Sequence, residues 1–394
     1  MRLSYDAETE AFRADLAAWL DDNAPAPSDM QEKKNSSAHL PGWAKKWQRT
    51  LFDAGWLVPG WEPELGGRNA TATQTLAYML ELERRGLPRS LNPQGIGIIG
   101  PSLKQFGTAE QQERWLLPML KGDATWCLGM SEPDAGSDLA GLRTKGELQS
   151  DGWHINGQKV WTSGAHDADW CFAFVRTEPE LAKHKGISTF VIDMKTPGIR
   201  TRPLPELASQ DFADFNEVFF DDVVVPEGNL IGERGQGWAI SMGSLGHERG
   251  MLWLGAWTRL QADVEELVKL GNDQPELGTD PRYRDAVAAH YVDATAMGAL
   301  GQLGFAKFVK GEPAPEHMIL KLYGSTAAQR LYDTAVQWVG PEALEAEHIA
   351  PSHDIYTGSW EDAYLHTYAN TIAGGTNEIQ RNIIAERVLG LPRA

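Results

Sequence analysis

The chain has few cysteines, a deficit of basic residues and no long apolar run. Its two cysteines, Cys127 and Cys171, are too few for a disulfide framework and lack metal-site spacing, which fits a reducing compartment. No apolar stretch approaches the roughly 20 residues of a membrane span, and the N-terminus, MRLSYDAETEAFRADLAAWL, is typical of an acidic amphipathic helix without a signal-peptide core. We therefore expect a soluble, cytoplasmic protein that enters no membrane.

The charge balance narrows the possible ligands. Lys and Arg total 36 against 54 Asp and Glu, a net charge of −18. Such an acidic surface repels nucleic acid and anionic membranes, so we expect neither as a partner. An anionic ligand must therefore be held locally, by backbone N–H groups or by a few arginines.

The hydrophobic periodicity divides the chain into three parts, and its 394 residues are enough for two or three domains. We predict an N-terminal helical domain (residues 1–122), a middle antiparallel β domain (123–232) and a C-terminal helical bundle (233–394), an α+β multi-domain fold.

Within these parts, the pattern predicts individual elements. Helices are expected near residues 6–22, 41–55, 71–86 and 109–121. In the middle part, short strands are expected, with hairpin turns at Asp151-Gly152 and Asn156-Gly157.

The segment GMSEPDAGSDLAG carries the strongest local signal. A strand ending in Ser131 runs into a turn with Gly136 and Ser137, whose small size lets backbone N–H groups and hydroxyls approach a phosphate or a planar heterocycle. The same letters also fit a tight turn capped by Asp134 and Asp138.

Two further segments favour the ligand-binding interpretation. In GQKVWTSGAHDADW, Trp161 and Ser163 are two residues apart, so on one strand an aromatic ring and a hydroxyl would face a flat ligand together. Near the C-terminus, Gly374, Gly375 and Thr376 precede a predicted helix, an arrangement that offers free N–H groups to an anion.

A charged pair interrupts the apolar helix SMGSLGHERGMLWLGAW. Helical spacing places Glu248 on the face of Leu245, Met251 and Leu252, beside the adjacent Arg249. Two interpretations remain open. Both charged side chains extend to water or bind a neighbouring helix, or the Glu248 carboxylate is a catalytic group that points into an apolar pocket.

Together these segments resemble the acyl-CoA dehydrogenase family over nearly the whole chain. The blocks in the family's order are ELGGRNATATQ, FGTAEQQERWLLPMLKGD, MSEPDAGSD, NGQKVWTSG, VPEGNLIGERGQGW, AVQWVGPEAL and GGTNEIQRNIIAERVLGLPR. The resemblance implies a three-domain fold, FAD bound between the β domain and the C-terminal bundle, an acyl-CoA substrate, and tetramers that pass electrons to an electron-transfer flavoprotein.

The resemblance also implies roles in the first half of the cofactor site. Met130 and Ser131 resemble residues that meet the flavin ring and ribityl chain, and Ser137, beside Gly136, would lie near the FAD pyrophosphate or the CoA arm. Trp161 would stack by the isoalloxazine, with Ser163 hydrogen-bonding near its N5. The remaining family positions are Gln337 and Gly340, which a neighbouring subunit would lend to the FAD adenosine, and Thr376 and Glu378, which would contact FAD from the C-terminal loop.

The implied reaction is α,β-desaturation, which needs a base at the thioester's α-carbon. The commonest branch of the family has this glutamate directly before the Gly-Thr of the C-terminal loop, where this sequence has Gly374. A second branch, resembling isovaleryl-CoA and long-chain enzymes, has it on the first long helix of the C-terminal domain, before an arginine. The resemblance therefore predicts Glu248 as the catalytic base, Arg249 beside the substrate, and the Gly374 N–H as a donor to the thioester enolate. Burial would raise the pKa of this glutamate toward working pH.

Two departures concern the cross-subunit part of the site. GTDPRYRDAVAAHY contains Arg282 and Arg284 without the Phe-Gly of many members, and Pro341 replaces the second glycine after Gln337. These departures resemble actinobacterial-looking members that pair unlike subunits, so a homotetramer and a heterotetramer both remain open. The other open alternatives are an acyl-CoA oxidase or flavin monooxygenase on the same fold, and a non-catalytic partner subunit.

Overall fold

The computed structural model describes residues 5–207, 213–244, 253–344 and 359–392. The chain forms two compact units. Unit 1 comprises Met1–Glu81, Pro88–Glu206 and Gln210–His247, and unit 2 comprises Leu82–Leu87, Leu207–Ser209 and Glu248–Ala394. The N-terminal helices and the sheet therefore share one unit, and the C-terminal helices from α8 (Trp253–Asp273) onward form the other.

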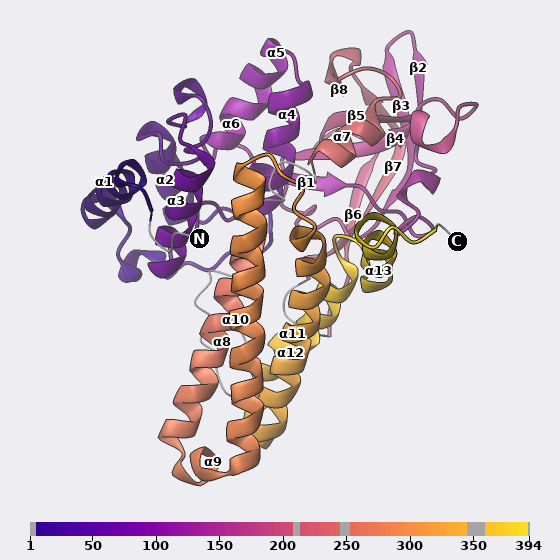
Figure 1. The fold of residues 1–394 in the computed structure, drawn as a ribbon. Coiled ribbons are helices and arrows are strands. Elements are labelled where there is room, and N and C mark those ends of the chain that lie inside the picture. Colours follow the sequence, from indigo (N-terminus) through magenta and orange to yellow (C-terminus); the bar gives the residue numbers. More distant parts are fainter. Residues whose placement is uncertain (1–4, 208–212, 245–252, 345–358, 393–394) are drawn as a thin grey trace. The chain divides into compact units, whose positions relative to one another are not determined.

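The N-terminal part is helical, as predicted (Figure 1). Its helices are α1 (Ala7–Asn23), α2 (Gly42–Asp53), α3 (Ala72–Arg84), α4 (Gly100–Phe106), α5 (Ala109–Gln111) and α6 (Leu117–Leu120), and unit 1 also contains α7 (Gly237–Ser244). Side chains define where two of them begin: Asp6 accepts the N–H of Thr9 at 2.7 Å, and Thr108 accepts that of Gln111 at 3.2 Å.

The middle part forms one antiparallel-rich sheet, as predicted, in the order β6-β7-β3-β2-β4-β5-β8 with β1 paired to β4. The strands are β1 (Trp126–Gly129), β2 (Lys145–Gln149), β3 (Gly152–Lys159), β4 (Trp170–Arg176), β5 (Ile187–Asp193), β6 (Ile199–Pro203), β7 (Asn216–Val225) and β8 (Leu230–Ile231). Two pairings, β1 with β4 and β2 with β4, are parallel, which the sequence did not predict.

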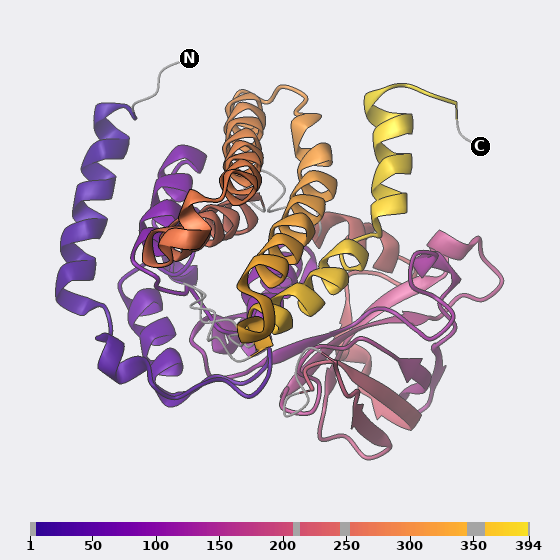
Figure 2. The ribbon, with the colours of Figure 1, turned by 90° about the horizontal axis from the view of Figure 1, so that it is seen from below.

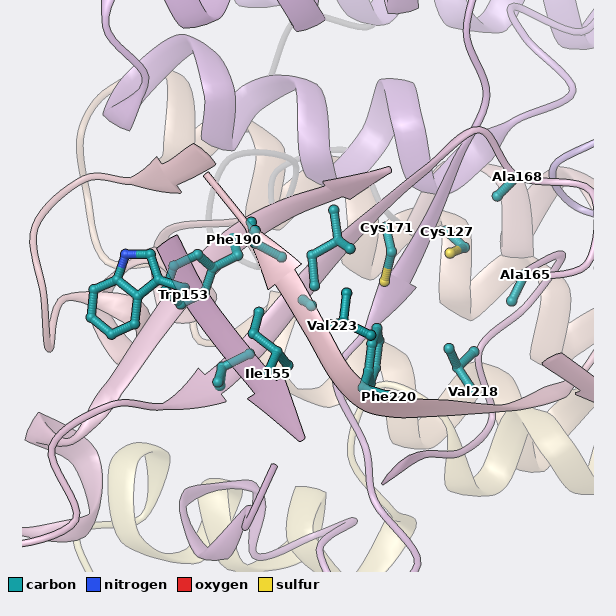
Figure 3. Close-up of a cluster of buried hydrophobic side chains, with 14 of the residues drawn as sticks. Cys127, Trp153, Ile155, Ala165, Ala168, Cys171, Phe190, Val218, Phe220 and Val223 are labelled. Carbon is teal, nitrogen blue, oxygen red and sulfur yellow. The ribbon is translucent and has the colours of Figure 1, made fainter. Parts of the chain in front are cut away.

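A cluster of buried apolar side chains covers one region of this sheet (Figure 3). Trp153 and Phe190 meet edge to face at 5.2 Å, and Cys127 lies opposite Cys171 in the β1–β4 register. Because all four are at most 2% exposed, their burial contributes to holding the strand ends that lead into the site.

One predicted hairpin turn is confirmed and one is wrong. The β2–β3 hairpin turns directly before Gly152, as predicted. Asn156-Gly157, however, lies inside β3, where the register with β7 shifts between Ile155 and Gly157. Gly157 has φ 152° and a Cβ there would lie 2.5 Å from the Thr144 hydroxyl oxygen, so the Asn-Gly pair forms a bulge and not a turn.

Unit 2 is a helical bundle, as predicted for the C-terminal part (Figures 1 and 2). Its helices are α8 (Trp253–Asp273), α9 (Pro275–Thr279), α10 (Pro281–Val309), α11 (Glu316–Val339), α12 (Trp360–Ile372) and α13 (Asn377–Ile383). Helices α8 and α10 approach closely because α10 has Gly301 where a Cβ would lie 2.2 Å from the ring of Trp253. In the described part of the chain, no helix is long and apolar enough to cross a membrane.

Candidate functional site

In unit 1, the structure brings the two predicted ligand-binding motifs together. The chain leaving β1 passes through Met130 and Ser131, and the Val160 N–H donates to the Ser131 carbonyl at 3.0 Å. The Lys159 ammonium, at the end of β3, donates to the Met130 carbonyl at 3.2 Å. Both carbonyls are thus bonded to β3 and the residue after it, which fixes the path of the predicted flavin-binding segment.

A buried ion pair anchors this junction. Lys159 Nζ lies 2.8 Å from Glu132 Oε1, and their side chains are 0% and 7% exposed. Glu132 also accepts the N–H groups of Arg143 at 2.6 Å and Thr144 at 2.9 Å. Burial raises the pKa of Glu132, but the charge of Lys159 and these hydrogen bonds outweigh it and hold the pKa below its ordinary value. Burial in turn lowers the pKa of Lys159, opposed by Glu132.

The placement of Trp161 differs from the prediction. Strand β3 ends at Lys159, and Trp161 has the left-handed φ of 60°, so Trp161 and Ser163 do not share a strand face. Hydrogen bonds of the neighbouring residues to the start of β7 and to the residues just before it explain the departure: Thr162 N–H donates to Asn216 O and Gly164 N–H to Asp214 O. The Trp161 ring is 61% exposed, with its edge toward Phe215 at 5.7 Å. Ser163 is half-buried.

The turn after Ser131 presents Gly136 and Ser137 to solvent. A Cβ on Gly136 would meet no atom within 4 Å, so the turn is open on this side. The Asp138 carboxylate pairs with Lys183 at 2.8 Å, and this hydrogen bond lowers its pKa. The turn therefore has open backbone where a ligand would approach.

An open cavity of about 410 Å³ follows this turn in unit 1. Its charged lining is mostly cationic and consists of Arg143, Lys145, Glu147, Arg176 and Lys183. Three of these cations have acidic partners, Lys145 with Glu147, Lys183 with Asp138 and Arg143 with Asp134, so the lining keeps a small excess of positive charge, which suits an anionic ligand.

In unit 2, the Gly374–Thr376 loop joins α12 to α13. Gly374 and Gly375 have φ of 66° and 93°, left-handed values that favour glycine. Gln380 Nε2 donates to the Gly374 carbonyl at 3.0 Å, and Lys321 Nζ donates to the Gly375 carbonyl at 2.7 Å. Thr376 caps α13 by accepting the Ile379 N–H at 3.2 Å.

Gly374 itself is exposed, and a Cβ built on it would meet no atom within 4 Å. Open space therefore lies beside Gly374, at the position where a glutamate side chain was considered from the sequence. The other predicted loop residue, Glu378, is exposed and pairs with Arg381 at 3.1 Å.

The residues predicted for the cross-subunit contact lie at the end of α11 and beyond it. Gln337 is exposed, and its side-chain amide donates to Asp333 at 2.9 Å. Gly340 ends the helix with φ 72°. At the start of α10, Arg282 pairs with Asp280 at 2.7 Å. This part of unit 2 thus presents polar side chains.

The predicted base and its neighbour, Glu248 and Arg249, lie outside the described residues. Helix α7 ends at Ser244 and α8 begins at Trp253. Their roles stay predictions.

Sequence reasoning missed four residues that hold the two predicted ligand-binding segments, Met130–Ser131 in unit 1 and Gly374–Thr376 in unit 2: Glu132, Lys159, Lys321 and Gln380. A weak signal existed for Lys321, the one charged residue in MILKLYG. No comparable signal marked Lys159, because its partner Glu132 is remote in sequence.

Comparisons with known proteins agree with this geometry. The chain matches three family descriptions: "Acyl-CoA dehydrogenase, N-terminal domain" at residues 6–123, "middle domain" at 127–223 and "C-terminal domain" at 235–389. It is 36% identical to acyl-CoA dehydrogenase IpdE1 of Mycolicibacterium smegmatis, over 98% of both chains. The chain belongs to the acyl-CoA dehydrogenase family. The enzyme class predicted from the sequence is thereby confirmed.

Other acyl-CoA dehydrogenases extend the comparison. FadE34 of Mycobacterium tuberculosis is 35% identical over 100% of this chain and 50% of its own. The steroid ACAD Tcur3481-Tcur3483 aligns over 100% of both chains with a TM-score of 0.82 and 28% identity. A chain in the crystal structure of the ChsE4-ChsE5 complex from Mycobacterium tuberculosis also aligns with this chain, over 100% of each, with a TM-score of 0.81 and 27% identity. The predicted three-part fold is that of this family.

Proposed function

We propose that this acyl-CoA dehydrogenase uses FAD to desaturate an acyl-CoA thioester between its α- and β-carbons. The observation that carries the proposal is the Gly374–Thr376 loop. Its two bonded carbonyls are directed toward Lys321 and Gln380, while the space beside Gly374 is open. A loop of this kind offers peptide N–H groups, and not a carboxylate, to a reacting thioester.

The residues present fit a flavin. A planar ring system needs an apolar face to stack on, and the indole of Trp161 is 61% exposed and held in a left-handed turn. The carbonyls of Met130 and Ser131 are bonded to Lys159 and Val160 at the end of β3. Ser163 follows the same strand end, two residues after Trp161. When bound, FAD supplies the acceptor for the hydride that leaves the β-carbon. The other residues that would hold it are Gly136, Ser137, Thr376 and Glu378, with Gln337 and Gly340 contributed from a neighbouring subunit.

The chain's own residues handle the proton and the developing charge. The Glu248 carboxylate removes the α-proton, and backbone N–H groups at the Gly374 loop donate to the thioester oxygen as negative charge accumulates there. The role that we propose for Arg249 is to contact the substrate. Because Gly374 has no side chain, the acid has to come from another element, which favours Glu248.

Two observations support a bulky acyl-CoA as substrate. An aligned structure of this family is named a steroid ACAD, and the missing side chain at Gly374 leaves room beside the reacting carbons. The anionic phosphates of CoA suit the cationic cavity with Arg143, Lys145, Arg176 and Lys183. We propose that electrons pass on to an electron-transfer flavoprotein.

The assembly completes the cofactor site. Two aligned structures have names that pair two components, Tcur3481-Tcur3483 and ChsE4-ChsE5. Pro341 and the absence of Phe-Gly near Arg282 are departures in the elements that a neighbouring subunit would contribute. A tetramer containing a second, related chain is therefore our preferred assembly, and the homotetramer is its alternative.

The test is anaerobic turnover of butyryl-CoA, octanoyl-CoA and a CoA thioester of a steroid side chain, with ferrocenium added as the electron acceptor that reoxidises the flavin and with enoyl-CoA measured by mass spectrometry. We expect Glu248→Gln to lower turnover at least about 100-fold, the scale of losing positioned proton transfer, with bound FAD unchanged. The control is Glu265→Gln, a change at an exposed carboxylate of α8. Near-normal turnover of Glu248→Gln would exclude the assigned base, and turnover in air without another acceptor would identify an oxidase.

A further inference from the structure

We propose that Lys321 is a positioning residue for the reaction: it fixes the peptide plane between Gly375 and Thr376 so that its N–H faces the thioester side. The inference rests on the proposed function. Lys321 lies on α11, and its Nζ donates to the Gly375 carbonyl at 2.7 Å and to Asn377 Oδ1 at 3.2 Å. Ser325, on the same helix, donates to Asn377 Oδ1 at 3.1 Å. Helix α11 therefore holds both sides of Thr376.

Because the peptide bonds are trans, the contacts of the two carbonyls also determine where the N–H groups of the same peptides point. In a trans peptide, the C=O and the N–H point in opposite directions. No cis peptide bond occurs in the described chain. Because the Gly375 carbonyl points to Lys321, the Thr376 N–H points away from it. The Gly374 carbonyl points to Gln380 at 3.0 Å, so the Gly375 N–H likewise points away from that side chain.

These N–H groups remain available for a ligand. No acceptor within the described ranges takes the N–H of Gly374, Gly375 or Thr376. Donors that are aimed in advance at the oxygen where negative charge develops lower the barrier, because they need no reorganisation during the reaction. The side-chain contacts of Lys321 and Gln380 provide such an arrangement for the N–H groups of Thr376 and Gly375. Because Gln380 holds the Gly374 carbonyl, it also limits the conformations open to Gly374, whose own N–H is the predicted donor to the thioester oxygen.

The charge of Lys321 adds to the effect. No carboxylate of the described chain lies within ion-pair distance of its ammonium group, which instead contacts the neutral oxygens of Gly375 and Asn377. Burial lowers the pKa of Lys321, and the more distant Glu378 opposes this. A positive charge that is not neutralised by a contacting acid stabilises an enolate oxygen near the loop more strongly than a paired one would.

The experiment compares Lys321→Met, which keeps the length of the side chain, with Lys321→Arg, which keeps the charge. Arg330→Met is the matched control, because Arg330 lies on the same helix and pairs with Asp293 at 2.6 Å, away from the loop. Each holoenzyme is assayed for kcat and KM with the acyl-CoA panel, for bound FAD, and for deuterium uptake from D₂O at the substrate α-carbon without an electron acceptor.

We expect Lys321→Met to lower kcat and α-deuterium uptake about 10- to 100-fold, below the loss for a deleted oxyanion donor, with KM and bound FAD changed less than about 3-fold. Lys321→Arg should recover part of both rates, and Arg330→Met should resemble the wild type. Unchanged rates in Lys321→Met, or a loss that matches a loss of FAD, would overturn the inference.

A readout that is independent of turnover separates this inference from the proposed function. The N–H groups of Ile379 and Gln380 bond to Thr376, so release of the loop should speed their hydrogen–deuterium exchange in Lys321→Met and not in Arg330→Met. A wild type without turnover would reject the proposed function whatever the exchange result. Unchanged exchange at these two amides would reject Lys321 as the anchor.

Discussion

Two lysines hold the two predicted ligand-binding segments of the molecule in different ways. In unit 1, Lys159 donates to the Met130 carbonyl and pairs with Glu132, in a site where the lysine is 0% exposed. In unit 2, Lys321 donates to the Gly375 carbonyl but contacts an amide and not a carboxylate. The first lysine is a structural anchor because its removal leaves a buried charge. The second orients a loop at little cost to folding, which suits a segment that must act on a substrate.

Among the tests of this difference, removing the Lys159 charge should have the largest effect, on the free energy of unfolding. We expect Lys159→Met to lower the free energy of unfolding by about 3–5 kcal/mol, because Glu132 stays buried without its partner. The measurement is urea denaturation followed by circular dichroism. The matched control is Lys145→Met, whose partner Glu147 is exposed, with an expected loss of at most about 1 kcal/mol.

A double variant shows whether the buried charge is the cause. Lys159→Met with Glu132→Gln should be more stable than Lys159→Met alone, because a neutral amide is less costly to bury than an unpaired carboxylate. If both variants lose equal stability, packing around Lys159 and not its charge anchors the junction. If Lys159→Met unfolds no more readily than Lys145→Met, Lys159 is not a structural anchor, and the difference argued between Lys159 and Lys321 is wrong.

The sequence predicted the helices, the antiparallel-rich sheet and the family because these depend on local periodicity and on ordered motifs. Its errors occurred where long-range pairing decides the local conformation. Asn156-Gly157 has the letters of a hairpin turn, yet pairing with β7 makes it a bulge. Trp161 follows a strand pattern, yet the hydrogen bonds of Thr162 to the first residue of β7 and of Gly164 to Asp214 end the strand.

The candidate site was predictable to a similar extent. Motifs identified the segments around Ser131, Trp161 and Gly374, because small residues and aromatics at a turn have recognisable spacing. The residues that fix these segments, Lys159 and Lys321, contact them from distant parts of the chain. Nothing in a single sequence reports such contacts.

An intermediate effect is expected from moving the acid between the two candidate positions in unit 2. Glu248→Gly should be nearly inactive, and adding Gly374→Glu should raise turnover at least about 10-fold above it if both positions face the same α-carbon. The open space beside Gly374 accommodates the new side chain, although its φ of 66° costs a non-glycine residue about 1 kcal/mol. The measurement is enoyl-CoA formation in the anaerobic assay.

The control for this exchange is Gly374→Gln with Glu248→Gly, which has the same backbone cost and shape but no carboxylate. Equal turnover of the two double variants would mean that the new side chain acts through packing. In that case the Gly374 position would not face the reacting carbon, and the idea that positions 248 and 374 face the same α-carbon would be wrong.

The smallest effect concerns the exposed ring in unit 1. We expect Trp161→Ala to weaken FAD binding about fivefold, or about 1 kcal/mol, because an exposed indole contributes stacking but little to folding. Trp161→Phe should retain most of the affinity, and both variants should unfold within about 0.5 kcal/mol of the wild type, since the ring is 61% exposed. FAD titration by fluorescence quenching and urea denaturation give the two numbers. A large loss of stability with unchanged FAD affinity would instead make Trp161 a packing partner of Phe215, and Trp161 would then not belong to the cofactor site.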